Sequence, residues 1–561
     1  MPLQKNQVLT LQVERLSSDG SGVAHSPEGE TVFIPGAAPG DEARVRIVKD
    51  CKRYAFGILD EVLKPSPDRI PVDCAVAGPC GGCSLRHLDY AAELRAKQEN
   101  VADAFARIGG LDVPVLPIVG SPEIDRYRNK VQFPVGTDKA GRPCIGFYAG
   151  RTHRIVPCPD CRLQPGVLNE IGNTLCAFFA EKGIHPYNEE TGKGLVRHIF
   201  LRRGAHSGQI MVCLVSTRAK LPSAEELCTR LKEAFPDIVT ILLNVNAKNT
   251  NVILGSETHT LYGQGYIEDT LCGVPVQLGP LSFYQVNTLA AEQLYGIAAE
   301  YAQLTPDDLL LDLYCGMGTI GLSMADHCRE LVGVEIVPEA IESAKANAAR
   351  MGAAVSAKSR FFCADAGQAA AQLAAEGLHP DVVMLDPPRK GCDGATLSAV
   401  VRMAPRRVVY VSCNPATAAR DAAWLEQNGY HAEKVQPVDL FPRTKHVETV
   451  VLLSHKKADS YIHIDVEFGE GEGKIPVDSI AKRAEAYKPK EKVTYKMIKE
   501  YIEAKYGFKV HTAYIAEVKR NLGLPMYDAP NAVEELKQPR KHPTPEKVEA
   551  IKDALRYFAV I

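Results

Sequence analysis

The stretch VVYVSCNPAT, residues 408–417, decides the fold class. Four apolar or aromatic residues in a row, 408–411, are typical of a strand buried inside a parallel sheet. Asn414-Pro415 ends this strand, because proline donates no ladder hydrogen bond and restricts the residue before it. Cys413 is therefore expected at the carboxyl end of a strand, where open α/β sheets place their chemistry. From this stretch alone, Cys413 is either a nucleophile or a small buried hydrophobe.

Length and composition indicate a multidomain globular protein. The chain has 561 residues, of which 45% are hydrophobic and 24% charged, enough for roughly three or four domains. No run approaches the ~18 apolar residues that cross a bilayer, and the first residues form no signal peptide. We therefore expect a cytoplasmic monomer with no membrane partner. The 16 cysteines favour metal, cofactor or catalytic roles in that reducing compartment, and the net charge of −3 restricts nucleic-acid contacts to local basic patches.

Residues 1–62 are predicted to form a small closed β-barrel. Alternating segments QVLTLQVERL, GETVFIPG and EARVRIVKD are joined by the turn-rich segments SSDGSG, SPEGE and GAAPGDE. The G-x-G-V pattern at residues 20–23 and VFIPGAAPGD at residues 32–41 resemble a TRAM domain, an OB-like RNA-binding module. The alternative is a β-barrel of unrelated use.

Residues 63–280 are predicted to form a central α+β domain that begins with a cysteine-rich loop. Cys74, Cys80 and Cys83 have the spacing C-x5-C-x2-C, and Cys158 and Cys161 form a C-x2-C pair downstream. Tetrathiolate sites hold either a [4Fe–4S] cluster or structural zinc. Zinc would use the two C-x2-C pairs and leave Cys74 over, so the extra thiol favours the cluster.

The rest of this central domain supplies helices, strands and one basic segment. AAELRAKQENVADAFARIGG is predicted to be an amphipathic helix ended by glycines, and GLVRHIFLRRG, IMVCLVS and IVTILLNVN are predicted strands. RYRNKVQFPVG, residues 126–136, alternates basic with aromatic side chains. This segment is either a strand that meets phosphates and stacks bases, or an ordinary exposed strand.

Residues 281–455 alternate strands with helices, which predicts a doubly wound, Rossmann-like sheet. LLLDLYCGMGTIGLSMA is a strand, a glycine turn and a helix, in which Gly316 and Gly318 let backbone amides approach a ligand. Glu335 ends the next strand, about 20 residues on, where a carboxylate accepts ribose hydroxyls. An adenosyl-type ligand and a dinucleotide both fit, since Gly321 completes G-x-G-x-x-G.

Two later segments separate these alternatives. DVVMLDPPRKG, residues 381–391, ends a strand in Asp386-Pro387-Pro388, which resembles the acidic-Pro-Pro signature of methyltransferases that act on planar nitrogen heterocycles. VDLFPRTKHVETVVLL places Glu448 close to His446, just before a last apolar strand. A dehydrogenase has no use for this set together with Cys413.

Jointly, these motifs resemble one family. LSFYQVN, DLYCGMGT, LDPPRKG, VSCNPAT and FPRTKHVETV follow the order found in TRAM-domain, iron–sulfur-containing RNA (uracil-5-)-methyltransferases of the 23S rRNA type. The resemblance covers residues 1 to about 455. It implies Cys413 as the nucleophile and Glu448 as the general base. The residues that it implies for S-adenosylmethionine are Gln285, Tyr314, Glu335 and Asp386, and those for a [4Fe–4S] cluster are Cys74, Cys80, Cys83 and Cys161.

Two details of this resemblance concern single residues. It favours Cys161 over Cys158, because the family's fourth ligand is followed two residues on by an aliphatic residue, as Leu163 follows Cys161. It also implies that Phe283 stacks on the target base.

These residue types suit the chemistry that the resemblance implies. Uracil C5 is a poor nucleophile, but a thiolate that adds to C6 turns C4–C5 into an enolate able to attack a sulfonium methyl group. The methylated base still carries its C5 proton, which a positioned base must remove before the thiolate leaves. The target must be flipped out or unpaired, because a base inside a helix cannot be reached in this way.

Residues 456–561 lie outside the resemblance and are predicted to be a small accessory extension. YIHIDVEF is a predicted strand, GEGEGK a loop, and residues 492–525 a helix, a turn and a helix. Residues 481–520 hold 11 Lys and Arg against 5 Glu, so a helix-turn-helix that contacts nucleic acid is one interpretation. An accessory helical domain with solvated charges is the favoured one.

The predicted function is methylation of uridine C5 in RNA, with 23S rRNA as the favoured partner. One alternative is uracil-5 methylation of tRNA, which is disfavoured because that branch typically lacks both the barrel and the cysteine cluster. Another is a non-catalytic iron–sulfur RNA-binding protein, against which the intact Cys413 and Glu448 argue.

Overall fold

The computed structural model describes the chain except residues 1–2, 151, 249, 457–494, 522–543 and 558–561. The chain divides into two compact units, Met1–Tyr461 and Ile462–Ile561. No helix within the described ranges is long and apolar enough to span a membrane.

The predicted N-terminal barrel is confirmed. Its five strands close in the order β1-β2-β3-β5-β4. Alternate side chains point inward, and Val13, Val32 and Val45 are buried in the barrel core. The strands are β1 (Val8–Leu16), β2 (Ser21–His25), β3 (Thr31–Pro35), β4 (Glu42–Asp50) and β5 (Tyr54–Lys64).

The central sheet has seven strands in the order β12-β11-β10-β9-β6-β7-β8. Helices α3 (Gly166–Glu181) and α4 (Ala224–Ala234) pack apolar side chains against it. The strands are β6 (Lys130–Thr137), β7 (Pro143–Tyr148), β8 (Ile155–Pro157), β9 (Val196–Arg203), β10 (Ile210–Ser216), β11 (Ile238–Val245) and β12 (Glu257–Tyr262). A hairpin of β13 (Ile267–Leu271) and β14 (Val274–Leu278) follows.

The predicted Rossmann-like sheet is also present, with the strand order β17-β16-β15-β18-β19-β21-β20. Its first five strands are parallel, and β21 runs antiparallel to both of its neighbours. The strands are β15 (Leu309–Leu313), β16 (Glu330–Glu335), β17 (Ser359–Cys363), β18 (Val382–Leu385), β19 (Arg407–Ser412), β20 (Tyr430–Val438) and β21 (Glu448–His455).

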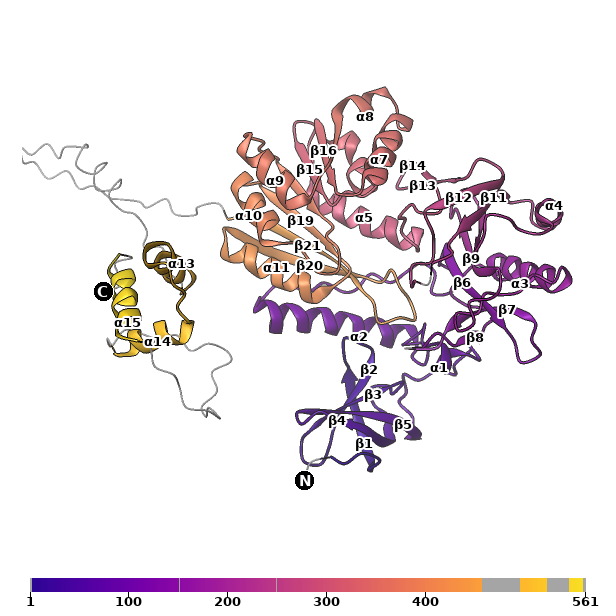
Figure 1. Cartoon of the computed structure of the whole chain (residues 1–561), viewed down its shortest axis with the longest axis horizontal. Helices are drawn as coiled ribbons and strands as arrows, with labels where there is room; N and C mark the ends of the chain where they lie inside the picture. Colours follow the sequence, from indigo (N-terminus) through magenta and orange to yellow (C-terminus); the bar gives the residue numbers. More distant parts are fainter. Residues whose placement is uncertain (1–2, 151, 249, 457–494, 522–543, 558–561) are drawn as a thin grey trace, which may run out of the picture. The chain divides into compact units, whose positions relative to one another are not determined.

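Helices cover both faces of this sheet, and two apolar clusters form its core (Figure 1). The near-continuous apolar strands, such as β19, are buried on both sides for this reason. The helices are α5 (Thr288–Ala302), α6 (Thr319–Ser323), η2 (Ala325–His327), α7 (Pro338–Arg350), α8 (Ala353–Lys358), α9 (Ala366–Ala375), α10 (Gly394–Met403) and α11 (Pro415–Gln427).

One helix from early in the chain contributes to the apolar cluster of the Rossmann-like domain that includes helix α11. Helix α2 (Tyr90–Asp103) begins at Asp89, whose side chain accepts a hydrogen bond from the Ala92 N–H, and it continues as the π-helix η1 (Ala104–Gly109). Phe105 is buried in the same apolar cluster as helix α11, and Figure 1 shows α2 alongside α11 and β20. The segment after it forms parallel bridges to β20, between Val115 and Val435 and between Val119 and Val438.

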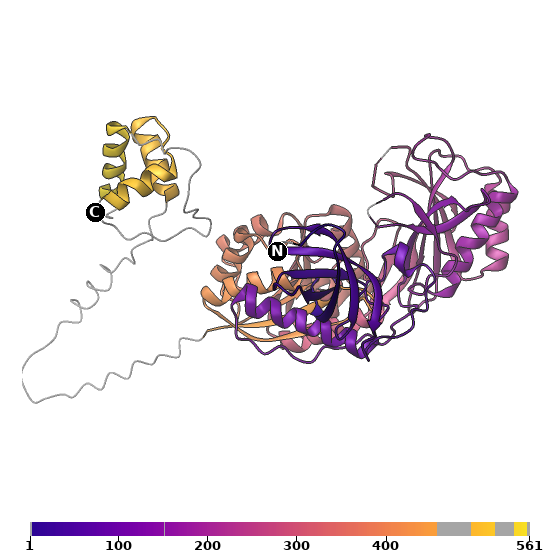
Figure 2. The ribbon, with the colours of Figure 1, turned by 90° about the horizontal axis from the view of Figure 1, so that it is seen from below.

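The second unit contains three described helices that share one apolar core. They are the yellow helices of Figure 2. They are α13 (Tyr495–Tyr506), α14 (Thr512–Asn521) and α15 (Pro545–Tyr557). The first two are the helices expected between residues 492 and 525. The expected strand YIHIDVEF and the loop GEGEGK lie outside the described residues.

Candidate active site

Cys413 and Glu448 lie next to each other at one edge of the Rossmann-like sheet. Strands β19 and β21 pair so that Ser412 stands opposite Thr449. Cys413 directly follows Ser412, and Glu448 directly precedes Thr449. Cys413 is half-buried, while Glu448 is only 6% exposed. The sheet register thus brings together two residues that are far apart in the sequence.

Local sequence explains why Cys413 occupies a turn. Asn414 caps helix α11, because its side chain accepts a hydrogen bond from the Ala416 N–H at 3.2 Å, and Pro415 takes the first helical position. The Asn414 amide also donates to the backbone carbonyl of Arg389 at 2.9 Å. This bond ties the DPPRKG loop to the turn that carries the cysteine.

The site gathers several acidic groups, and the cation Arg389 acts on both Glu448 and Cys413. Burial raises the pKa of Glu448 to about 8, and the charge of Asp386 adds to this effect while Arg389 opposes it. Burial also raises the pKa of Asp386 to about 7. The pKa of Cys413 is raised by burial first and then by Glu448 and Asp386, and a hydrogen bond and charge from Arg389 lower it. Such perturbed groups are typical of proton-transfer sites.

Three of the four residues predicted for cofactor binding follow neighbouring strands at this same edge. Tyr314 follows β15 with a φ of 65°, Glu335 ends β16, and Asp386 follows β18. The Glu335 carboxylate accepts the Gly316 N–H at 3.2 Å and the Ile336 N–H at 2.8 Å, which orients it beside the glycine turn.

The fourth predicted cofactor residue, Gln285, lies just before helix α5. Its backbone carbonyl accepts a hydrogen bond from the Asn129 amide at 2.8 Å. Burial raises the pKa of Tyr295 on that helix, and hydrogen bonds to Thr319 and Gln285 oppose this rise. Gln285 is thus linked to helix α6, which follows the glycine turn.

Sequence analysis missed two charged residues of this site. Asp312 is buried within β15, where it accepts the Gly321 N–H at 3.0 Å, and burial raises its pKa to about 8. The sequence signal for Asp312 was a single carboxylate inside the otherwise apolar strand LLLDL. The other is Arg389, whose place directly after Asp-Pro-Pro was the signal.

Cys413 lines a pocket of about 460 Å³. Segments from three parts of the first unit line this pocket: the β1–β2 end of the barrel, helices α2 and η1, and the Rossmann-like domain. The basic side chains among its lining residues are Arg15, Arg107, Arg389 and Lys445. Phe283 is 73% exposed and is not among the lining residues.

A buried ionic network holds the loop that precedes Glu448. Lys97 of helix α2 donates to Glu93 at 2.7 Å, to Asp439 at 2.8 Å and to the Phe441 carbonyl at 3.1 Å. The Glu93 carboxylate also accepts the backbone N–H of Arg443 at 2.7 Å. Helix α2 therefore positions the segment that leads into the candidate base.

The predicted cysteine ligands come from two segments that approach each other. Cys80 ends the short helix α1 (Ala77–Cys80), and its pKa is raised by burial and by the nearby Cys161 and Cys74. The four predicted ligands are partly exposed, whereas Cys158 is only 3% exposed. Within the described ranges, no three His, Cys, Asp or Glu side chains form a group that could hold a metal ion. The four thiols are the donor type that an iron–sulfur cluster requires. In this structure they are not close enough together to form a metal-binding group.

Charged side chains fasten these cysteine segments together. Arg86 pairs with Asp73 at 2.6 Å and also with Asp125. Arg126 donates to Asp160 at 2.7 Å and to the Cys161 carbonyl at 2.9 Å.

The interpretation of RYRNKVQFPVG as a base-stacking strand is wrong, because the rings of Tyr127 and Phe133 are buried and Arg126 is engaged with the cysteine segment.

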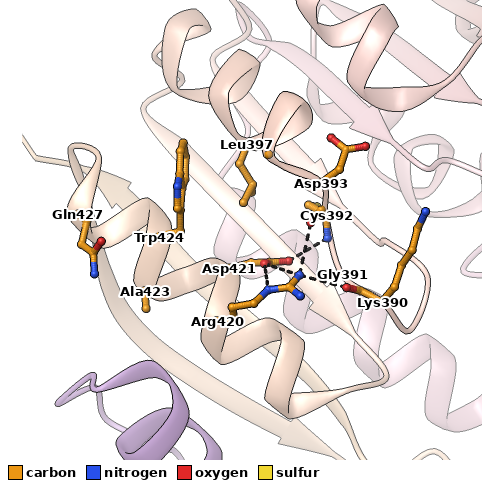
Figure 3. Close-up of a pocket in the computed structure, with 11 residues that line it drawn as sticks. Lys390, Gly391, Cys392, Asp393, Leu397, Arg420, Asp421, Ala423, Trp424 and Gln427 are labelled. Carbon is orange, nitrogen blue, oxygen red and sulfur yellow. Dashed lines mark hydrogen bonds and ion pairs between the residues drawn. The ribbon is translucent and has the colours of Figure 1, made fainter. Parts of the chain in front are cut away.

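A second pocket, of about 440 Å³, lies between helices α10 and α11 (Figure 3). Buried Asp421 accepts the Cys392 N–H at 2.8 Å and the Tyr410 hydroxyl at 2.6 Å, and Arg420 pairs with it. None of the predicted site residues lines this pocket.

The fold and the site define an S-adenosylmethionine-dependent methyltransferase. Residues 277–456 match the family model described as tRNA (Uracil-5-)-methyltransferase, and residues 2–59 match the TRAM domain. An RNA methyltransferase of Halalkalibacterium halodurans is 43% identical over 456 residues, which cover 81% of this chain and 98% of the relative. Another of Oceanobacillus iheyensis is 42% identical, with coverage of 81% and 98%. The chain belongs to the RNA (uracil-5-)-methyltransferase family.

A solved structure agrees with this assignment. The tRNA (uracil-54, C5)-methyltransferase of Pyrococcus abyssi, determined with S-adenosyl-L-homocysteine, is similar with a TM-score of 0.63 and 28% identity. The match covers 80% of this chain and all of that one. The expected TRAM barrel and methyltransferase domain are thus confirmed.

Proposed function

We propose that this RNA (uracil-5-)-methyltransferase works through a covalent adduct between Cys413 and C6 of a uridine. The observation that carries the proposal is the adjacency of Cys413 and Glu448 at the ends of paired strands, where Cys413 lines a pocket and Glu448 is buried. A nucleophile and a base so placed can reach a single flipped uracil.

In this mechanism Cys413 adds to C6 of uracil as a thiolate, and Arg389 stabilises the anion. S-adenosylmethionine supplies the methyl group that C5 acquires. Glu448 then takes the proton from C5, which restores the C5–C6 double bond and expels the Cys413 thiolate. Glu448 acts here in its ionised form, which a pKa of about 8 leaves as a minority near neutral pH, and a carboxylate with a raised pKa is the stronger base for this step.

The cofactor side of the site would be formed by Gln285, Tyr314, Glu335 and Asp386. Glu335 suits the ribose hydroxyls, since its carboxylate is held at the end of β16 by the amides of the turn and of the loop that follows it. The positive φ of Gly316 and Gly318 lets the turn between β15 and α6 approach a ligand closely.

The adduct can be trapped. Glu448→Gln keeps the shape of the side chain but removes the base, so methylated RNA should remain bound to Cys413. We expect a denaturation-resistant protein–RNA band that carries label from the methyl group of S-adenosylmethionine. Cys413→Ala, alone or combined with Glu448→Gln, should form no such band. Normal turnover by Glu448→Gln would assign the base to another residue.

We favour 23S rRNA as the substrate, because the chain combines the barrel with the cysteine-rich segment. A tRNA is the second candidate, since the Pyrococcus abyssi relative is a tRNA (uracil-54, C5)-methyltransferase and matches 80% of this chain. Mapping 5-methyluridine in rRNA and tRNA from cells with and without the gene discriminates between the two substrates.

We further propose that Cys74, Cys80, Cys83 and Cys161 hold a [4Fe–4S] cluster. Two observations support this set: all four thiols are partly exposed, and Cys161 brings a second chain segment to the other three. The backbone N–H groups of Leu163 and Gln164 also donate to the Cys161 sulfur, as is usual for a cluster ligand. The cluster would fasten the two cysteine segments to each other.

Metal analysis of protein purified without oxygen tests this set. We expect about four irons and four sulfides per chain, loss of both in Cys161→Ser, and retention in Cys158→Ser. Stoichiometric zinc without sulfide would contradict the cluster, and the reverse result for the two variants would exchange the ligand assignment.

A further inference from the structure

Ile108 is a large apolar residue that stands exposed at the candidate active site. Its side chain is 57% exposed, and it lines the same pocket as Cys413. It lies near the end of the π-helix η1, and π-helical turns occur frequently at functional sites. Ile108 is thus an apolar group presented to whatever enters the pocket.

The backbone around Ile108 is held in place by close packing. Phe105, in the same π-helix, is buried in the core that includes Ala418 and Ala419 of helix α11. Gly109 approaches helix α11 so closely that a Cβ there would lie 3.0 Å from the Ala419 carbonyl oxygen. The helix end that exposes Ile108 is therefore held in place by this packing.

Basic side chains line the same pocket as Ile108. Arg15 of the barrel and Arg107 of η1 each approach the Asp103 carboxylate at 3.3 Å. Arg389 and Lys445 line the same pocket. Four cations against one carboxylate leave an excess of positive charge at the pocket rim, which suits the phosphates of an RNA strand.

An enzyme that extrudes a base leaves a gap in the stack. Apolar side chains, isoleucine among them, can insert between neighbouring bases of a nucleic acid. We propose that Ile108 is such a wedge: it enters the stack beside the target uridine and fills the space left when that base moves toward Cys413. Arg15 and Arg107 hold the flanking phosphates. This inference rests on the proposed function, and it makes Ile108 a positioning residue.

The test compares two versions of the RNA hairpin in which the wild-type enzyme places 5-methyluridine. In the first, the uridine is stacked between its natural neighbours; in the second, both neighbours are abasic. We expect Ile108→Ala to lower the single-turnover rate of methyl transfer about tenfold on the stacked RNA and to leave the rate on the abasic RNA unchanged. Ile108→Leu should retain the wild-type rate on both.

A second measurement reports unstacking directly. With 2-aminopurine next to the target uridine, the wild-type enzyme should raise the fluorescence and Ile108→Ala should not. Val252→Ala removes an equally exposed apolar side chain that does not line the pocket, and it should behave as the wild type.

An equal loss on both RNAs, or no loss on either, would overturn the wedge. Failure of the proposed function gives a different result, because Glu448→Gln would then trap no methyl-labelled adduct on the stacked RNA, whatever the rates of the Ile108 variants.

Discussion

At the scale of single residues, the candidate site gathers three carboxyl groups that burial makes harder to ionise. Glu448, Asp386 and Asp312 all have raised pKa values because burial disfavours their charged forms. Burial of this kind costs stability near neutral pH, and it is retained where it makes a stronger base.

The stability lost by burying Glu448 should be measurable as a pH dependence of the free energy of unfolding. The folded protein keeps the Glu448 proton up to about pH 8, whereas the unfolded chain releases it near 4.5. The folded state binds more protons between these values, so the free energy of unfolding falls as the pH rises. Glu448→Gln should thus gain stability over the wild type, by about 4 kcal/mol at pH 8 and by almost nothing well below pH 4.5.

Urea denaturation at a series of pH values measures this difference. Glu300→Gln, which changes a side chain that is mostly exposed, is the control and should show no such trend. A constant difference between Glu448→Gln and the wild type at all pH values would mean that Glu448 is not buried as a neutral acid.

At the scale of elements, helix α2 organises the loop between β20 and β21. Lys97 pairs with both Glu93 and Asp439 inside the protein, and the Glu93 carboxylate holds the Arg443 backbone. Removing one partner of a buried charge cluster leaves the others unpaired, which costs far more than an exposed ion pair contributes.

Lys97→Met should therefore lower the free energy of unfolding by about 3–5 kcal/mol. It should also reduce adduct formation, because the segment before Glu448 loses its support. Lys456→Met breaks the exposed pair with Glu426 and should cost less than about 1 kcal/mol. Denaturation curves that are equal for the two variants would exclude a structural role for the network.

This network also shows how far sequence patterns reach. The strand before Cys413, the glycine turn and the barrel follow from local apolar patterns and turn residues, and they were predicted. Lys97 looks like the polar face of an amphipathic helix, because its partner Asp439 is 342 residues away in the chain. In the same way, the sequence left open whether Tyr127 and Phe133 stack on bases, and only the structure shows that both rings are buried.

The pocket itself was also beyond sequence analysis. Cys413 and Arg389 could be located from their motifs, but Arg15 and Ile108 join them only through the packing of η1 and the barrel. Distant segments that meet through packing leave no periodic signal in either one.

At the scale of the whole molecule, the Rossmann-like core is completed by residues from the first 120 positions. Phe105 is part of its apolar cluster, and Val115 and Val119 bridge to β20. The expected domain boundary at residue 281 would separate these residues from the core that they fill.

Two truncations test this arrangement. A chain ending at residue 461 keeps the whole first unit and should melt cooperatively and methylate naked RNA at the full-length rate. A chain of residues 281–461 lacks α2 and should show no cooperative transition by circular dichroism. Cooperative melting of the shorter fragment would show that the Rossmann-like domain does not need α2. Separately, a flatter salt dependence of RNA binding in the chain that ends at residue 461 would assign RNA binding to the tail.

The Lys97 network has a consequence for synthesis. Translation proceeds from the N-terminus, so Glu93 and Lys97 leave the ribosome long before Asp439 is made, 342 residues after Lys97. The barrel and the central sheet can fold in that interval, while Lys97 of helix α2 has Glu93 as a partner but still lacks Asp439. Asp439, Arg443 and Glu448 emerge together near the end of the first unit. A nascent chain thus acquires its base and the clamp that positions it at nearly the same moment, and a prematurely terminated one acquires neither.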